Sequence, residues 1–181
     1  YRLRDSFMRS ARLQEHVRFL FSQGSVYKCF NSNLLYHGCV PLCEDGSLKK
    51  VFIDGKHLSG KALLDASDAL ARQGYFAPEN TEKRRNGMDF MWYLWCGKDS
   101  PLFGRSKMTT FERCLIEDRS TWVEEKNAYY HHTNDEKACD RILEEFGLDP
   151  QCSHIINGHV PVKTKDGESP IKANGRLIVI D

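Results

Sequence analysis

Two histidines share a setting that suits metal binding. His37 follows the apolar run 33–36, and His159 follows a buried strand predicted over 153–157; a glycine adjoins each histidine. A sheet holds a strand-end side chain rigidly, and glycine lets backbone and ligand approach closely. Neutral imidazole is a good ligand for Mn, Fe or Zn. The pattern predicts that His37 and His159 bind one metal ion; the alternative is that each is an ordinary residue of a strand-end turn.

The predicted loop over 97–107 gathers three cations, Lys98, Arg105 and Lys107, around two glycines. A guanidinium can bind two phosphate oxygens at once, which makes Arg105 the first candidate for holding a phosphate group. Lys98 and Lys107 are further candidates. Cationic loops are usually only solvated, so the charge pattern alone does not decide between the two interpretations.

The remaining histidines and the cysteines show no comparable pattern. Cys39 and Cys43 have a C-x3-C spacing that can belong to a zinc site, but no matching second pair exists. Seven scattered cysteines without C-x-x-C favour reduced thiols over a disulfide framework. No Walker loop, nucleophile elbow or dinucleotide fingerprint is present.

The elements that would position these residues are a mixture of helices and strands. The class is therefore α/β, with α+β as the alternative. Apolar periodicity and end signals predict helices over 1–24, 59–74, 88–95 and 135–146, and Asn134 is expected to cap the last of them. Strands are predicted over 26–30, 33–36 and 153–157, and hairpins around 54–55 and 174–175. Residues 77–87 are predicted to form an exposed loop. Residues 110–116 fit a short helix or a strand.

The composition fits a globular protein and limits the classes of partner. Of 181 residues, 40% are apolar and 28% charged, and 26 Lys and Arg balance 25 Asp and Glu to a net charge of +1. A dedicated nucleic-acid binder usually has a basic excess, and no apolar run reaches the roughly 18 residues that span a membrane. Because the chain begins at Tyr1 and stops within a strand-like run, we expect residues 1–181 to form one partial domain, cut at both ends.

Several strings resemble a known family. Residues 33–42 (NLLYHGCVPL) are similar to the His-Gly-Gly motif of the phosphoprotein phosphatase branch of the calcineurin-like metallophosphoesterases, and 157–162 (NGHVPV) to its Gly-His motif. Residues 91–112 and 171–181 resemble the class III fructose-1,6-bisphosphatases of the Firmicutes and Bacteroidetes type. The resemblance implies that this chain is the C-terminal half of a calcineurin-like metallophosphoesterase β-sandwich flanked by helices.

The same resemblance implies a cytoplasmic enzyme that removes the 1-phosphate of fructose 1,6-bisphosphate in gluconeogenesis. His37 and His159 would bind one ion of a dinuclear centre, with manganese expected and other divalent metals as alternatives, while Arg105, Lys98 and Lys107 would bind substrate phosphate. The family's Asp-x-His, Gly-Asp-x-x-Asp-Arg and Gly-Asn-His motifs are absent here. The catalytic residues are therefore expected upstream in a longer protein, and this chain alone is predicted to be inactive.

Two departures and two alternatives accompany the resemblance. Cys39 replaces the second glycine of His-Gly-Gly, and Pro161 stands where many superfamily members have a further histidine ligand. The function could instead be that of another phosphatase acting on phosphoproteins or dinucleoside polyphosphates, or of a non-catalytic binding or assembly domain. No nucleic-acid or membrane partner is expected, whereas exposed sheet edges would favour pairing into a homo-oligomer.

Overall fold

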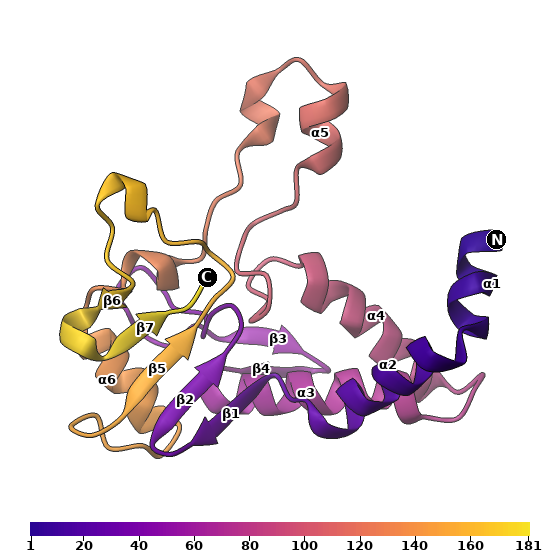
Figure 1. Ribbon diagram of the computed structural model, residues 1–181, viewed down its shortest axis with the longest axis horizontal. Helices are drawn as coiled ribbons and strands as arrows, with labels where there is room; N and C mark the ends of the chain where they lie inside the picture. Colours follow the sequence, from indigo (N-terminus) through magenta and orange to yellow (C-terminus); the bar gives the residue numbers. More distant parts are fainter.

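A five-stranded mixed sheet organises the computed structural model, which describes all residues 1–181 (lower left in Figure 1). Its spatial order is β1-β2-β5-β7-β6, with β2, β5 and β7 parallel and both edge strands antiparallel to their neighbours. Its strands are β1 (Tyr27–Phe30), β2 (Asn33–Tyr36), β5 (His154–Asn157), β6 (Ile171–Lys172) and β7 (Leu177–Val179). The hairpin predicted around 54–55 is a separate pair, β3 (Val51–Ile53) and β4 (Lys56–Leu58).

Six α-helices and four short 3-10 turns complete the chain, which confirms the mixed α/β class. The helices are α1 (Arg2–Arg9), α2 (Ala11–Gln23), α3 (Gly60–Phe76), α4 (Glu82–Cys96), α5 (Thr110–Leu115) and α6 (Glu136–Glu145). The 3-10 turns are η1 (Arg119–Trp122), η2 (Ala128–His131), η3 (Thr164–Asp166) and η4 (Ala173–Gly175). None of the helices combines the length and the apolar character that crossing a membrane requires.

The core lies between one face of the sheet and helices α3 and α6. Alternate residues of the central strands point into it: Leu34, Ile155 and Leu177 are completely buried. Leu63 and Leu64 of α3, with Ile142 and Leu143 of α6, close the cluster. The intervening residues Leu35, Ile156 and Ile178 lie on the other face and are only half-buried. The sheet is therefore fully covered on one face alone.

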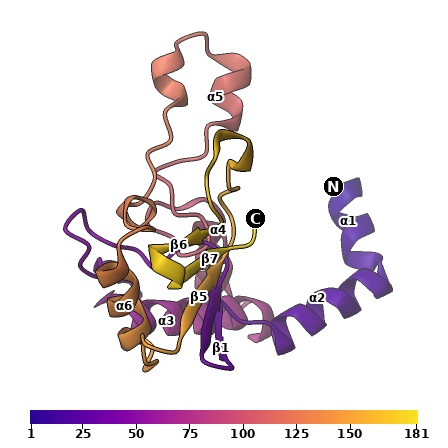
Figure 2. The same cartoon turned by 60° about the vertical axis from the view of Figure 1, so that its left-hand side comes forward.

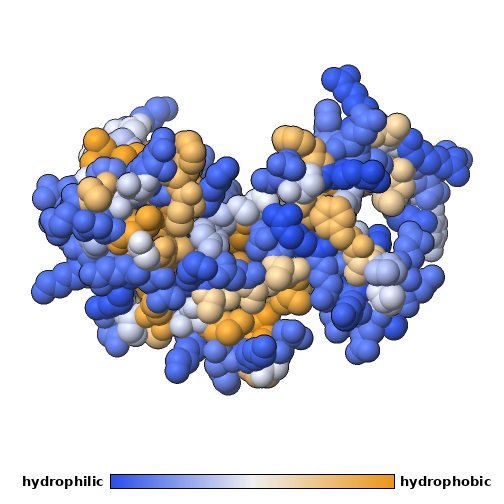
Figure 3. Space-filling view, turned by 90° about the horizontal axis from the view of Figure 1, so that it is seen from below, coloured by the Kyte–Doolittle hydropathy of each residue, from blue (hydrophilic) through white to orange (hydrophobic).

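Two segments project from this body. The chain between the neck residues 104–106 and 125–127 forms an arm, residues 107–124, that carries α5 and η1 away from the sheet (Figures 1 and 2). Helices α1 and α2 extend from the body in another direction, to the right in Figure 2. Seen from below, apolar side chains reach the surface at several places between hydrophilic ones (Figure 3). The exposed large apolar residues on the two projections are Leu3, Phe7, Met8, Phe19, Leu20, Met108, Phe111, Leu115, Ile116 and Val123.

The exposed loop predicted over 77–87 is confirmed for residues 77–81 and wrong for residues 82–87, which belong to helix α4. Helix α4 begins after Thr81, whose hydroxyl caps it by accepting a hydrogen bond from the Arg84 amide at 3.2 Å. Helix α3 does not end at Gly74 but continues to Phe76. Gly74 and Gly87 are both buried because they are the point where α3 and α4 touch. The sequence pattern had indicated that Gly74 ends its helix. In the structure Gly74 instead lets α3 and α4 approach closely.

Two other helix boundaries differ from the prediction. The helix expected over 1–24 is broken at Ser10, which has extended backbone angles between α1 and α2. The cap of α6 is Asp135, whose carboxylate accepts a hydrogen bond from the Lys137 amide at 3.0 Å, rather than Asn134. Residues 110–116, which fitted either structure, contain the helix α5.

Replacing Gly74 with alanine is expected to destabilise the protein by about 1–3 kcal/mol, as overpacking does. A β-carbon at Gly74 would stand 2.6 Å from the Gly87 carbonyl carbon, a contact with backbone that no rotamer change can relieve. A free helix would instead gain about 1 kcal/mol from Gly→Ala, so the expected sign is reversed. Urea unfolding tests this, with Asn86→Ala on the exposed face of α4 as control. A stabilised Gly74→Ala variant would contradict the close packing.

Candidate metal centre

The two histidines predicted to act together lie side by side at the carboxyl ends of β2 and β5. These neighbouring parallel strands pair Leu34 with Ile155, and the pairing continues past their ends, where the Gly158 amide donates to the His37 carbonyl at 3.0 Å. The Nε2 of His37 lies 2.9 Å from the Nδ1 of His159. Carboxyl ends of parallel strands are where α/β sheets generally bind ligands.

The ring of His159 is held in one orientation. Its Nε2 donates a hydrogen bond to the Phe103 carbonyl at 3.0 Å, and since a carbonyl can only accept, that nitrogen carries the proton. The lone pair of the neutral ring is then on Nδ1, the atom that faces His37. The backbone of His159 has φ +71°, a left-handed conformation that costs energy for any residue other than glycine. Strain of this kind is typical of functional sites.

The surroundings favour the neutral form of His159. Partial burial lowers its pKa below the ordinary 6.5, and the neighbouring His37 and Arg105 lower it further. A neutral imidazole can donate its lone pair to a metal ion, whereas a protonated one cannot. Because the lone pair on His159 Nδ1 faces His37 Nε2 at 2.9 Å, the Nε2 of His37 carries the proton in this contact and donates it. For His37 to bind an ion through Nε2, that proton would have to be on Nδ1 instead.

The spacing of the pair fits a shared ion. Two imidazole nitrogens bound at about 2.1 Å to one ion stand about 3 Å apart when the two bonds make a right angle. The observed 2.9 Å between His37 Nε2 and His159 Nδ1 is close to that value. No group of three or more His, Cys, Asp or Glu side chains in residues 1–181 is arranged to hold an ion. The two histidine nitrogens are therefore a pair without a third such side chain arranged beside them for an ion.

The space in front of the histidines is mostly apolar. A hollow of about 460 Å³ has both rings on its lining, together with Leu94, Trp95 and Phe103. An apolar lining excludes water and strengthens electrostatic interactions at its edge. None of the side chains on its lining carries an oxygen atom.

The predicted phosphate-binding cations are only partly gathered. Lys98 and Arg105 line one cavity of about 310 Å³, to which Lys49 and Lys126 also contribute. Lys107 does not line it, and its Nζ donates to the Thr121 carbonyl at 2.8 Å at the base of the arm. Sequence reasoning missed Lys49 and Lys126 because each lies far from the 97–107 loop along the chain and carries no motif of its own.

Two carboxylates offset part of this positive charge. Asp99 pairs with Lys49 at 2.8 Å, and Glu124 pairs with Arg105 at 2.7 Å. Nε of Arg105 is buried and has no partner. The guanidinium is held at the wall of this cavity by the hydrogen bond from its Nη1 to Glu124.

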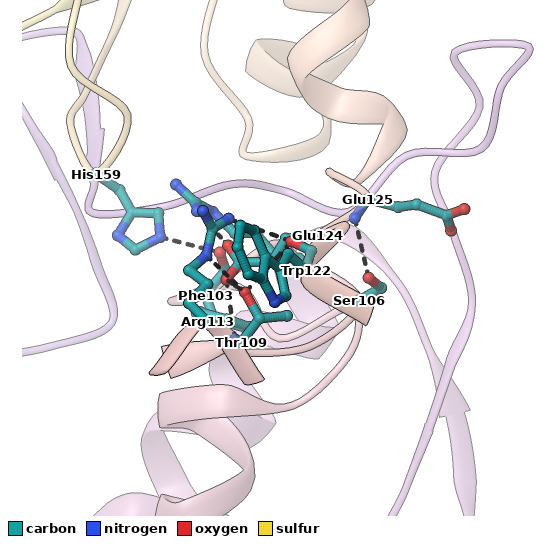
Figure 4. A network of polar contacts seen from close by, with 9 residues as sticks. Phe103, Ser106, Thr109, Arg113, Trp122, Glu124, Glu125 and His159 are labelled. Atoms are coloured by element: carbon teal, nitrogen blue, oxygen red, sulfur yellow. Dashed lines mark hydrogen bonds and ion pairs between the residues drawn. The ribbon is translucent and has the colours of Figure 1, made fainter. Parts of the chain in front are cut away.

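Glu124 organises the base of the arm beside His159 (Figure 4). It accepts hydrogen bonds from the backbone amide of Thr109 at 2.9 Å and from its hydroxyl at 2.6 Å. Desolvation raises the pKa of Glu124, but the hydrogen bonds from Thr109 and Arg105 outweigh it and lower the pKa to about 2. The ionised carboxylate therefore stabilises this junction.

The contribution of Glu124 is expected to depend on pH. A carboxylate with a depressed folded pKa stabilises fully above its unfolded value of 4.5 and loses this effect as the pH falls towards about 2. Glu124→Gln should cost about 1–3 kcal/mol at pH 7, and the difference from wild type should shrink below pH 4.5. Urea unfolding at pH 7, 4 and 2.5 measures this, with the exposed neighbour Glu125→Gln as control. A difference that does not change with pH would contradict this role.

The other histidines and the C-x3-C pair are not arranged as a metal site. His131 lies 3.5 Å from Glu44, and His132 lies 3.5 Å from Asp135. Cys39 is completely buried, and burial raises the pKa of its thiol, which disfavours the thiolate that binds zinc.

The family model and the curated relatives that match this chain all describe fructose-1,6-bisphosphatases. The model of the Firmicute fructose-1,6-bisphosphatase family matches residues 1–181. A fructose-1,6-bisphosphatase class 3 of Clostridium botulinum (strain Langeland) is 61% identical over 180 residues, which is 99% of this chain and 27% of that protein. The Clostridium novyi (strain NT) protein of the same name is 57% identical over the same shares. The chain thus spans 27% of the length of the curated relatives it matches. No solved structure matches.

Proposed function

Because the chain belongs to the Firmicute fructose-1,6-bisphosphatase family, we propose that the full-length protein hydrolyses the 1-phosphate of fructose 1,6-bisphosphate with divalent metal ions. The observation that carries this proposal is the 2.9 Å approach of His37 Nε2 and His159 Nδ1 at two parallel strand ends. A bound dinuclear centre, with manganese as the expected metal, supplies hydroxide near neutral pH and stabilises charge on phosphoryl oxygens.

In this proposal the two histidines hold one ion from the same side. His159 would bind through Nδ1, because its Nε2 proton is fixed on the Phe103 carbonyl. His37 would bind through Nε2, the atom that faces His159. The remaining ligands, including the carboxylates that neutralise the ions, and the catalytic residues would come from parts of the full-length protein outside residues 1–181.

Substrate phosphate would be held by Arg105, Lys98 and Lys107, of which Arg105 lies close enough to His159 to influence its pKa. Arg105 has a buried Nε donor without a partner and lies two residues from Phe103, whose carbonyl orients His159. Lys98 lines the same cavity as Arg105. Lys107 stays a candidate as well, at the junction of the loop and the arm. The three cations would orient the bisphosphate and offset its negative charge.

The proposal includes the finer fold. Leu35, Ile156 and Ile178 form a half-buried apolar face opposite the helices, which is the kind of face that a second sheet covers in a sandwich. Residues 1–181 would then be one partial domain, the C-terminal half of a calcineurin-like β-sandwich. The enzyme is proposed to act in gluconeogenesis in the cytoplasm. The exposed apolar residues could form the interface of a homo-oligomer.

Metal removal tests the proposed activity. Purified full-length protein should release phosphate and fructose 6-phosphate from fructose 1,6-bisphosphate, lose at least about 100-fold of its rate in excess EDTA, and regain it with Mn²⁺. A phosphopeptide and diadenosine tetraphosphate in parallel assays separate this enzyme from other phosphatases of the branch. Faster turnover of either compound than of fructose 1,6-bisphosphate would show that the proposed substrate is wrong. If the protein turns over no phosphate ester at all, the result favours a binding or assembly domain.

A further inference from the structure

A buried amide lies directly behind the histidine pair. Asn157, the last residue of β5, is 3% exposed. Its Nδ2 donates to the Gly38 carbonyl at 3.1 Å and to the Tyr129 hydroxyl at 2.9 Å. We propose that Asn157 is a positioning residue that fixes His37 and His159 at the spacing one metal ion needs. This inference rests on the proposed metal centre.

The position of Asn157 in the chain links both histidines. Gly38 follows His37, so the amide holds the chain immediately after the first histidine. Asn157 itself lies two residues before His159. Each histidine adjoins a glycine, and glycine is the residue with the largest backbone freedom. The bond from Asn157 to the Gly38 carbonyl removes part of that freedom at both strand ends (β2 and β5, Figure 1).

The main chain of Asn157 is itself held. Its carbonyl accepts from the Ile180 amide at 2.8 Å, just past β7, and the next residue, Gly158, donates to the His37 carbonyl at 3.0 Å. Asn157 therefore ties the ends of three neighbouring strands together. Its side chain is the only part of this clamp that a substitution can remove without changing the backbone bonds.

The partners determine which way the amide points. The Gly38 carbonyl can only accept, so Nδ2 must face it. The Tyr129 hydroxyl accepts from Asn157 and also from the Tyr36 hydroxyl, at 2.8 Å. Burial raises the pKa of both tyrosines well above 10, so the network stays uncharged. A neutral donor is what the site requires at Asn157, and aspartate could not supply it when ionised.

The other end of the amide argues against a purely stabilising role. Oδ1 of Asn157 is buried without a protein partner, and so is the Tyr130 hydroxyl on the same cavity of about 80 Å³. A buried acceptor without a partner costs about 1–3 kcal/mol, which a leucine would avoid. The cavity exceeds the roughly 30 Å³ that one water occupies, so water can reduce this cost. Keeping an amide here is better explained by the geometry it imposes than by stability.

The test compares metal binding by folded full-length variants. Asn157→Ala removes the amide donor without adding charge, Asn157→Leu removes all polar contacts at nearly the same size, and Tyr36→Phe is the matched control. The control removes a buried hydroxyl of the same network but leaves both bonds of Asn157 in place. Mn²⁺ affinity is measured by EPR titration of the free ion, and urea unfolding without metal gives stability separately.

We expect both Asn157 variants to bind Mn²⁺ about 10- to 100-fold more weakly, the usual effect of removing a residue that orients metal ligands. Tyr36→Phe should stay within about threefold of wild type even if it loses as much stability. Wild-type affinity in folded Asn157 variants, or an equal loss in Tyr36→Phe, would overturn the positioning role alone. If His37→Ala also binds Mn²⁺ like wild type, the proposed metal centre itself is wrong.

Discussion

Replacing His159 with alanine in the full-length protein is expected to lower turnover of fructose 1,6-bisphosphate at least about a thousandfold, or about 4 kcal/mol of transition-state stabilisation. The proposed role of this ring is to bind the metal ion through Nδ1, because its Nε2 is bound to the Phe103 carbonyl and its Nδ1 faces His37 at 2.9 Å. The left-handed backbone of His159 indicates that its position is held at an energetic cost. His37→Ala should behave alike.

The control for this prediction is His154→Ala. His154 lies on the same strand, but its side chain is exposed and its Nδ1 contacts the Gly175 carbonyl at 2.9 Å, away from the pair. Steady-state kinetics and the Mn content of the purified proteins are measured together. Turnover near the wild-type rate in His159→Ala would remove this residue from the site, and a similar loss in His154→Ala would point to damage of the fold.

Residues 1–181 expressed alone are expected to show no turnover above the uncatalysed rate, a loss of at least about a millionfold. Their two histidines have no third metal-binding side chain beside them, and the hollow in front of them is mostly apolar. A dinuclear centre needs carboxylates to balance its charge, and two neutral imidazoles cannot supply them.

The measurement for this prediction is phosphate release from fructose 1,6-bisphosphate with Mn²⁺, next to the full-length protein at equal concentration. Far-UV circular dichroism of the isolated chain shows whether its helices and strands are formed. Turnover comparable to that of the full-length protein would contradict both the incomplete ligand set and the assignment of catalytic residues outside the chain.

The sequence predicted the parts of the fold that local pattern controls. The runs that became β2 and β5 were recognisable as short apolar segments, and each ends in a histidine next to a glycine. The shared pattern led to the prediction that the two histidines act together. The register of β2 and β5 and the 2.9 Å between the two ring nitrogens are set by strand pairing, which the sequence does not show. The hairpins around 54–55 and 174–175 were found because turn residues mark them.

The errors arose where tertiary contacts outweigh local signals. Residues 82–87 are polar and contain a glycine, so they resembled a loop, yet Gly87 is needed where α4 touches Gly74 of α3. Asn157 was hidden within an apolar run, and only the structure shows its bonds to Gly38 and Tyr129. Lys107 was grouped with Arg105 by proximity in sequence; the structure shows its Nζ donating to the Thr121 carbonyl, and its role toward phosphate stays a prediction. Each case depends on a partner more than ten residues away.

The decisive measurement is anomalous diffraction from crystals of the full-length protein loaded with Mn²⁺. We predict a manganese peak in contact with both His37 Nε2 and His159 Nδ1, with the His159 Nε2 still bonded to the Phe103 carbonyl. A manganese-loaded, active enzyme whose anomalous peaks contact neither nitrogen would contradict the shared metal ion on which the proposed function depends.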